Sequence, residues 1–163
     1  MDVSATKLAL LHVPIDWIIL GVLVVLITLD AIRSGSNRAV SIALALPAAF
    51  FLFNELSQSL LLGGMVNKLS SPIAQGIVFL GLVVVFYFII HRILGFYGIS
   101  SGAPLQALIA GIATTILIAV VWVQALWLQP LWHFGPQVQA IFAEGYRFWW
   151  VMGAYVALAA VRS

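Results

Sequence analysis

The sequence predicts an all-α membrane protein, a bundle of helices that crosses the bilayer several times. Hydrophobic residues make up 64% of the 163 residues and charged residues only 7%, whereas charged residues reach about 25% in soluble domains. The mean hydropathy is +1.16, so there is too little polar surface to cover a globule in water. Because a spanning helix needs about 20 apolar residues, the chain has room for four spans and a fifth, C-terminal one.

The first span is expected over residues 15–32, after an N-terminal interfacial segment over residues 1–14. Pro14 closes that segment, because proline disfavours helix at the residue before it. Trp17 suits the aromatic belt at a membrane boundary. No small-residue cleavage site precedes Asp30, so we expect the span to be retained and not removed as a signal peptide. Residues 15–163 then form a single transmembrane helical domain.

Three further spans are expected over residues 39–62, 73–93 and 105–128. Pro47 lies inside the second of them and removes one backbone hydrogen bond there. The stretches between the spans, GGMVNKLSSP and LGFYGISSGAP, are rich in glycine, serine and proline, as connecting loops are. After the fourth span, QPLWHFGPQ ends the helix with two prolines and a glycine.

The fifth span is expected over residues 147–162. Its uncharged run, residues 148–161, is short for a span, but Arg147 and Arg162 can extend their side chains toward the headgroups. The same segment could also lie along the interface; of the two, we favour the span.

Orientation follows the excess of lysine and arginine in cytoplasmic loops. Five spans would divide the basic residues four against three between the two sides, with Arg33, Arg38, Arg92 and Arg162 on one side and Lys7, Lys68 and Arg147 on the other. The close pair in the first loop places that loop in the cytoplasm and the N-terminus outside. The chain is thus expected to be a multi-pass protein of the inner (plasma) membrane.

The stretch ITLDAIRSGSNRAVSI concentrates charge between the first two spans. If the first helix persists through Arg33, Asp30 and Arg33 share one face and can form an ion pair. With Arg38, they could be a helix-end ion pair and an anchor for anionic lipid, or the mouth of a path or a docking site.

Asn54 and Glu55 form a second polar group, late in the second span. A charge at the bilayer centre costs about 2.5–3.5 kcal/mol and usually faces a bundle interior, which would suit a relay for protons or cations. Counted from Ala39, however, Glu55 lies roughly 24 Å along the helix, near the far interface. Glu55 could therefore lie in the bundle interior or among the headgroups.

Other features indicate packing more than chemistry. Ala107, Gly111 and Thr115 are spaced by four and form a stripe of small residues that lets membrane helices approach closely. His91 and Arg92 end the third span, where the helix dipole favours cations. The sequence has no cysteine, no Walker or GxGxxG motif and no HxxxH spacing, and we expect no enzyme, no cofactor, no metal site and no nucleic-acid partner.

The first span and its loop resemble the colicin V production protein family (CvpA) of bacterial inner membranes. IDWIILG supplies Asp16 in the pattern Ile-Asp-aromatic, and IRSGSNR supplies Arg33, Gly35 and Arg38. One residue is inserted between the arginine and the glycine, and the aromatic that usually follows is absent. A later motif is reduced here to Gly111 within APLQALIAGIATT, so the roles of its charged residues do not carry over.

The resemblance, which covers residues 15–127, implies an inner-membrane protein associated with toxin production or export and envelope transport. Two functions follow as alternatives. The first is a non-enzymatic transport or export protein, with Asp30, Arg33, Asn54 and Glu55 beside the path. The second is a structural or scaffold subunit of a larger membrane complex. Either would contact the lipid bilayer and form a homo-oligomer or bind other membrane proteins.

Overall fold

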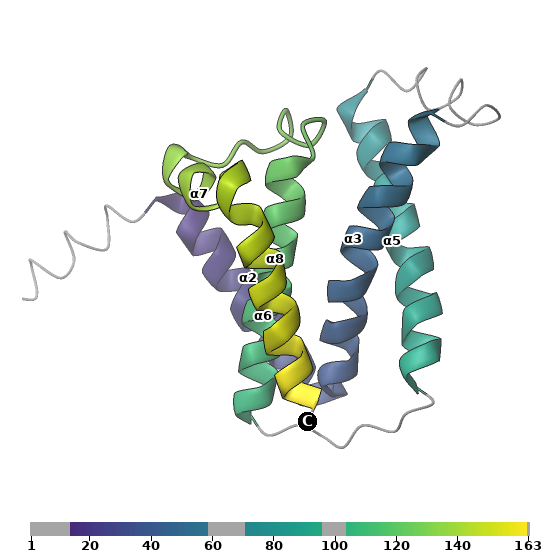
Figure 1. Cartoon of the computed structure of the whole chain (residues 1–163), viewed down its shortest axis with the longest axis vertical. Coiled ribbons are helices and arrows are strands. Elements are labelled where there is room, and N and C mark those ends of the chain that lie inside the picture. The colour runs from purple at the N-terminus through teal and green to yellow at the C-terminus, as the bar shows by residue number, and fades with distance from the viewer. Residues whose placement is uncertain (1–13, 59–70, 96–103, 163) are drawn as a thin grey trace, which may run out of the picture.

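The computed structural model describes residues 14–58, 71–95 and 104–162 of the chain, and these ranges are helical apart from short connections (Figure 1). The helices are α2 (Ile15–Ser34), α3 (Ser36–Gln58), α5 (Pro72–Gly95), α6 (Pro104–Gln124), α7 (Pro136–Ile141) and α8 (Glu144–Arg162). The prediction of an all-α membrane bundle is confirmed. The predicted interfacial segment lies outside the described residues except for Pro14.

Four of these helices, α2, α3, α5 and α6, are long and apolar enough to cross a membrane. They correspond to the four predicted spans. Helix α8 has 19 residues, but Glu144 and Arg147 stand in its first turn, so its uncharged run is shorter. The fold does not require a fifth span, and that span stays a prediction.

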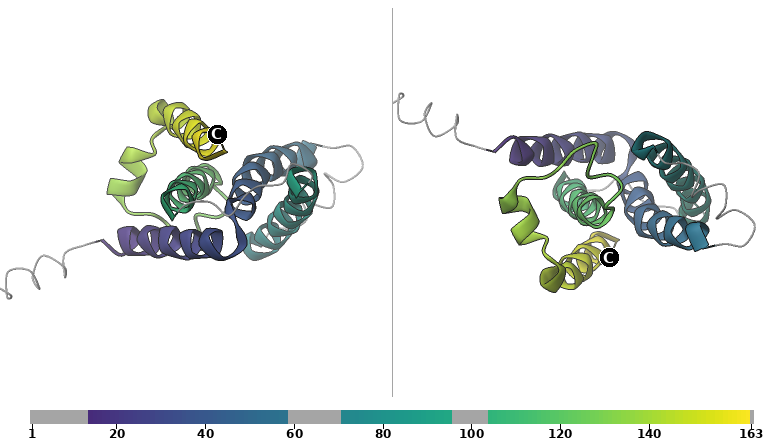
Figure 2. Two further views of the ribbon diagram at one scale, coloured as in Figure 1. Left: turned by 90° about the horizontal axis from the view of Figure 1, so that it is seen from below. Right: turned by 90° about the horizontal axis from the view of Figure 1, so that it is seen from above.

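Helix α6 is the centre of the bundle and packs against α2, α3 and α8. Figure 2 shows these three helices around α6, with α5 on the far side of α3. In the most apolar window of α6, 61% of the residues are buried, against 6% in α5. The small residues of α6 make this crowding possible, because they let neighbouring backbones approach.

Gly111 shows how close α6 and α2 come. A Cβ built at Gly111 would collide with Thr28 Oγ1 and would lie 3.1 Å from the Thr28 amide nitrogen and 3.2 Å from the Val24 carbonyl oxygen. Two of these three atoms belong to the α2 backbone and cannot move away as the end of a side chain can. Helix α6 therefore needs glycine at this crossing.

Several helix boundaries differ from the prediction by a few residues. Helix α3 begins at Ser36, not at residue 39, so Gly35 alone separates it from α2. Helix α6 ends at Gln124, before residue 128, and turns follow. Pro130 has no N–H, and its ring would clash with the carbonyl of residue 126 in a continued helix, so α6 cannot continue past it. Residues 59–62, predicted as the end of the second span, lie outside the described residues.

The turns after α6 are anchored by aromatic packing. The Trp127 ring lies 4.6 Å from that of Phe53 in α3 and 5.3 Å from that of Phe79 in α5, measured between ring centroids. This cluster holds the end of α6 against the α3–α5 pair.

The alternating helix directions give the bundle two ends. The arginine end, low in Figure 1, contains the α2–α3 turn and the end of α5, with Asp30, Arg33, Arg38 and Arg92. The α7 end contains the start of α2, the end of α3 and residues 125–143.

Candidate functional site

The turn between α2 and α3 organises the arginine end. Gly35 has φ 84° and ψ 153°, a region that is essentially restricted to glycine. One residue thus reverses the chain, and the reversal brings the start of α3 back beside the end of α2. The polar residues predicted to form a loop belong instead to the two helices.

Arg38 connects three helices at this end. Its Nη1 donates hydrogen bonds to Asp30 Oδ1 at 2.9 Å and to Ser34 Oγ at 3.0 Å, both on α2. Its Nε donates to the Tyr87 hydroxyl of α5 at 3.4 Å. The side chains of Arg38 and Asp30 are 44% and 41% exposed, so the ion pair is a surface pair and contributes at most about 1 kcal/mol.

The predicted ion pair between Asp30 and Arg33 is wrong. Asp30 pairs with Arg38, because the tight turn brings the first turn of α3 within reach of the α2 carboxylate. The Arg33 side chain is exposed and makes no ion pair within the described ranges.

A second set of contacts extends the cluster between α3 and α5. The His91 ring stacks on Tyr87 with centroids 5.4 Å apart and planes 11° from parallel. Ser41 Oγ donates to the Asn37 carbonyl at 2.7 Å and lies 3.5 Å from His91 Nδ1. The serine has one proton and gives it to the shorter bond, to the Asn37 carbonyl.

The cluster also holds an unsatisfied acceptor. Asn37 Oδ1 is buried and has no hydrogen-bond partner in the described part of the chain, which is uncommon for a buried polar atom. Sequence reasoning did not find Asn37, Ser41 or Tyr87. The signal was present, because Asn37 and Ser41, like Tyr87 and His91, are four residues apart and share a helix face.

Asn54 and Glu55 do not join this cluster. Both are exposed, near the end of α3, and Glu55 lies about 25 Å along the helix from Arg38. Between the two ends, the buried hydroxyls of Thr114 and Thr115 donate to carbonyl oxygens of α6 itself, at 2.8 and 2.9 Å. The residues that the sequence grouped beside one path are thus divided between opposite ends.

Asp16 has a clear structural role at the α7 end. Its side chain is buried; Oδ2 accepts a hydrogen bond from the Gly135 amide at 2.7 Å, and Oδ1 accepts one from Trp132 Nε1 at 3.3 Å. A Cβ at Gly135 would lie 2.8 Å from Asp16 Oδ2. Asp16 thus ties the connection between α6 and α7 to the start of α2.

The small-residue stripe is used within the chain. Ala107, Gly111 and Thr115 are all buried, and Gly111 faces the α2 backbone. A second copy of the chain therefore cannot pack on Gly111 while α2 stays in place.

No group of three or more His, Asp or Glu residues suited to a metal ion occurs in residues 14–58, 71–95 and 104–162. Comparisons with models of protein families, with curated proteins and with solved structures find no match.

Proposed function

We propose that the chain is a non-enzymatic, multi-pass protein of the bacterial inner membrane that acts as a structural subunit of an envelope transport or toxin export complex. One observation favours a structural subunit over a protein that forms a transport path. The charged side chains of the described bundle gather at its two ends, while an apolar core of alanine, leucine and phenylalanine side chains lies between them. Within the described ranges, this core leaves ions no continuous polar route through a single chain.

The resemblance to the colicin V production family supports the setting of this proposal. Asp16 and Gly35, two residues of the matched pattern, both have demanding environments: a buried carboxylate and a glycine-only backbone conformation. Such environments explain why a pattern would contain these residue types.

The arginine end is proposed to face the cytoplasm. Within the described ranges, its side chains include Arg33, Arg38 and Arg92 against the single acid Asp30. The α7 end carries Asp16, Glu55 and Glu144 with Arg147. This contrast agrees with the positive-inside rule.

Helix α5 is the surface most open to a partner. It packs mainly on α3, and side chains such as Leu80 and Phe88 are more than 60% exposed. A subunit of this kind is expected to be isolated with other membrane proteins, or as several copies, when it is extracted in native lipid. Native mass spectrometry measures this directly, and particles that hold only the 17.7 kDa chain would contradict the proposal.

A transport path is the second candidate, favoured by the buried and unsatisfied Asn37 oxygen. The purified chain in vesicles loaded with a pH-sensitive dye distinguishes the two. A structural subunit gives no more proton or potassium flux than empty vesicles. Flux that disappears in the double variant Asp30→Asn, Glu55→Gln, while the protein still inserts, would establish the path instead.

A further inference from the structure

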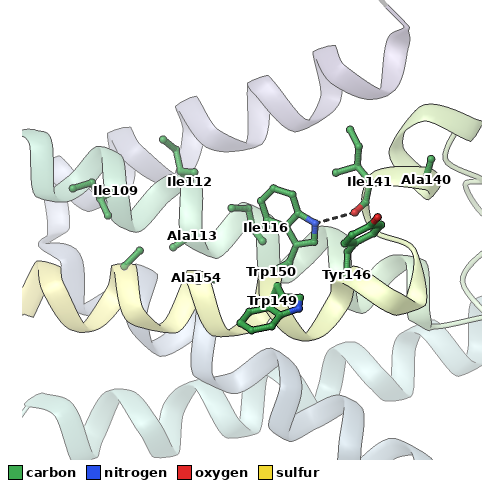
Figure 3. Close-up of a pocket in the computed structure, with 12 residues that line it drawn as sticks. Ile109, Ile112, Ala113, Ile116, Ala140, Ile141, Tyr146, Trp149, Trp150 and Ala154 are labelled. Carbon is green, nitrogen blue, oxygen red and sulfur yellow. Dashed lines mark hydrogen bonds between the residues drawn. The ribbon is translucent and has the colours of Figure 1, made fainter.

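An apolar groove with a volume of about 800 Å³ lies between α6 and α8, next to α7 (Figure 3). Its α6 wall is formed by isoleucine and alanine side chains, including Ile112 and Ile116. Its α8 wall has aromatic residues in the first part of the helix, such as Trp149, and small residues farther along, such as Gly153. The α6 wall belongs to a membrane-spanning helix, so the groove is within reach of the bilayer interior.

The groove exists because α8 presents small residues opposite the α6 isoleucines. A Cβ built at Gly153 would meet no atom within 4 Å. Gly153 is also exposed, so the space in front of it opens to the surroundings. In a bilayer, such a space is filled by an apolar group.

Hydrogen-bond donors stand at the α7 side of the groove. Trp150 Nε1 is already used, since it donates to the Ile141 carbonyl at 2.8 Å. The Tyr146 hydroxyl and Trp149 Nε1 make no hydrogen bond to the described residues, and their side chains are 62% and 70% exposed. An apolar groove with free donors at one end complements a molecule with a hydrocarbon chain and oxygen acceptors at its head.

The length of the groove favours a lipid acyl chain over a transmembrane helix as its occupant. Its α8 wall runs from Tyr146 to Ala157, about 16 Å at 1.5 Å per residue. The hydrocarbon core of a bilayer is about 30 Å thick, so the groove matches one leaflet. A spanning helix from a second copy would need a groove of about twice this length.

We propose that this groove binds one acyl chain of a membrane glycerophospholipid, with the ester and phosphate oxygens near Tyr146 and Trp149. The site is independent of the proposed subunit function. The lipid fills the space between α6 and α8 and stabilises the packing of α8 on the bundle.

The test uses Gly153→Leu, which places an apolar side chain in the groove at a position where a Cβ meets no atom within 4 Å. The matched control is Gly81→Leu on α5, where a Cβ also meets nothing within 4 Å. The full chain is reconstituted in vesicles of phosphatidylethanolamine and phosphatidylglycerol, extracted gently, and examined by native mass spectrometry. We expect one phospholipid to stay bound to the wild type and to the control, and to be lost from Gly153→Leu.

A second measurement does not depend on the folding of a variant. Phosphatidylethanolamine with a diazirine in its acyl chain, added to the wild type in the same vesicles, is expected to label residues 109–116 and 146–157 above other lipid-facing segments. Equal labelling of α5, or equal retention of lipid by Gly153→Leu and the wild type, would overturn the proposal. So would a disulfide-linked dimer of Gly153→Cys, because the chain has no other cysteine and the groove would then face a second copy.

Discussion

The crossing of α2 and α6 gives the sharpest test of the packing, through the variant Gly111→Ala. The added methyl group would collide with Thr28 Oγ1 and press on backbone atoms of α2 at 3.1 and 3.2 Å. The Thr28 hydroxyl can avoid the methyl group only by a change of rotamer. The backbone atoms can avoid it only if the whole of α2 moves. Inserting a methyl group into such a contact costs about 1–3 kcal/mol.

Alanine also gains helix propensity over glycine, by about 1 kcal/mol, and this gain must be separated from the clash. Gly81→Ala on α5 provides the separation, because a Cβ there meets nothing within 4 Å. The difference between the two variants isolates the cost of the crossing, which we expect to lower the folding equilibrium constant of Gly111→Ala roughly tenfold to a hundredfold relative to the control.

The assay is reversible unfolding of the purified protein in mixed micelles with increasing SDS, followed by tryptophan fluorescence and circular dichroism. Thr28→Ala removes the nearest colliding atom and leaves the two backbone contacts, so the double variant should recover part of the loss. Equal stability of Gly111→Ala and Gly81→Ala would refute the close crossing.

Three further substitutions test the two ends of the bundle in the same assay. Gly35→Ala places a Cβ at φ 84° and ψ 153° and should cost about 1–3 kcal/mol, while Gly21→Ala, which has open space, should not destabilise the fold. Asp16→Asn weakens two hydrogen bonds to a carboxylate and should cost about 1.5–3 kcal/mol, with faster proteolysis of residues 125–135. Arg38→Gln loses a partly exposed ion pair and should cost at most about 1 kcal/mol, yet more than Arg33→Gln.

Each of these expectations has a contrary outcome. A wild-type stability for Gly35→Ala would mean that the turn does not need a glycine-only conformation. Unchanged proteolysis in Asp16→Asn would remove the tie between α2 and the α6–α7 connection. A greater loss of stability in Arg33→Gln than in Arg38→Gln would indicate that Asp30 pairs with Arg33, the partner predicted from helical spacing.

The sequence by itself determined the fold class and the positions of four membrane helices. Both depend on local properties, because a run of about 20 apolar residues is long enough to span the bilayer whatever its neighbours are. The stretches rich in glycine, serine and proline, and Pro130, likewise disfavour helix only within a few residues of their own positions. Boundaries near a tight turn were less accurate, since the spacing alone did not show that Gly35 is the whole connection.

Only the tertiary structure decided which residues meet. Helical spacing offered Asp30 a partner three residues away, but the reversal at Gly35 supplied Arg38. The small residues of α6 predicted a close approach of another helix but did not indicate that this helix is α2. The roles of Asp16 and Gly153 depend on segments far away in the sequence. Pairings of this kind depend on how helices turn and cross, and an apolar pattern is equally compatible with many crossings because each buries the same kind of surface.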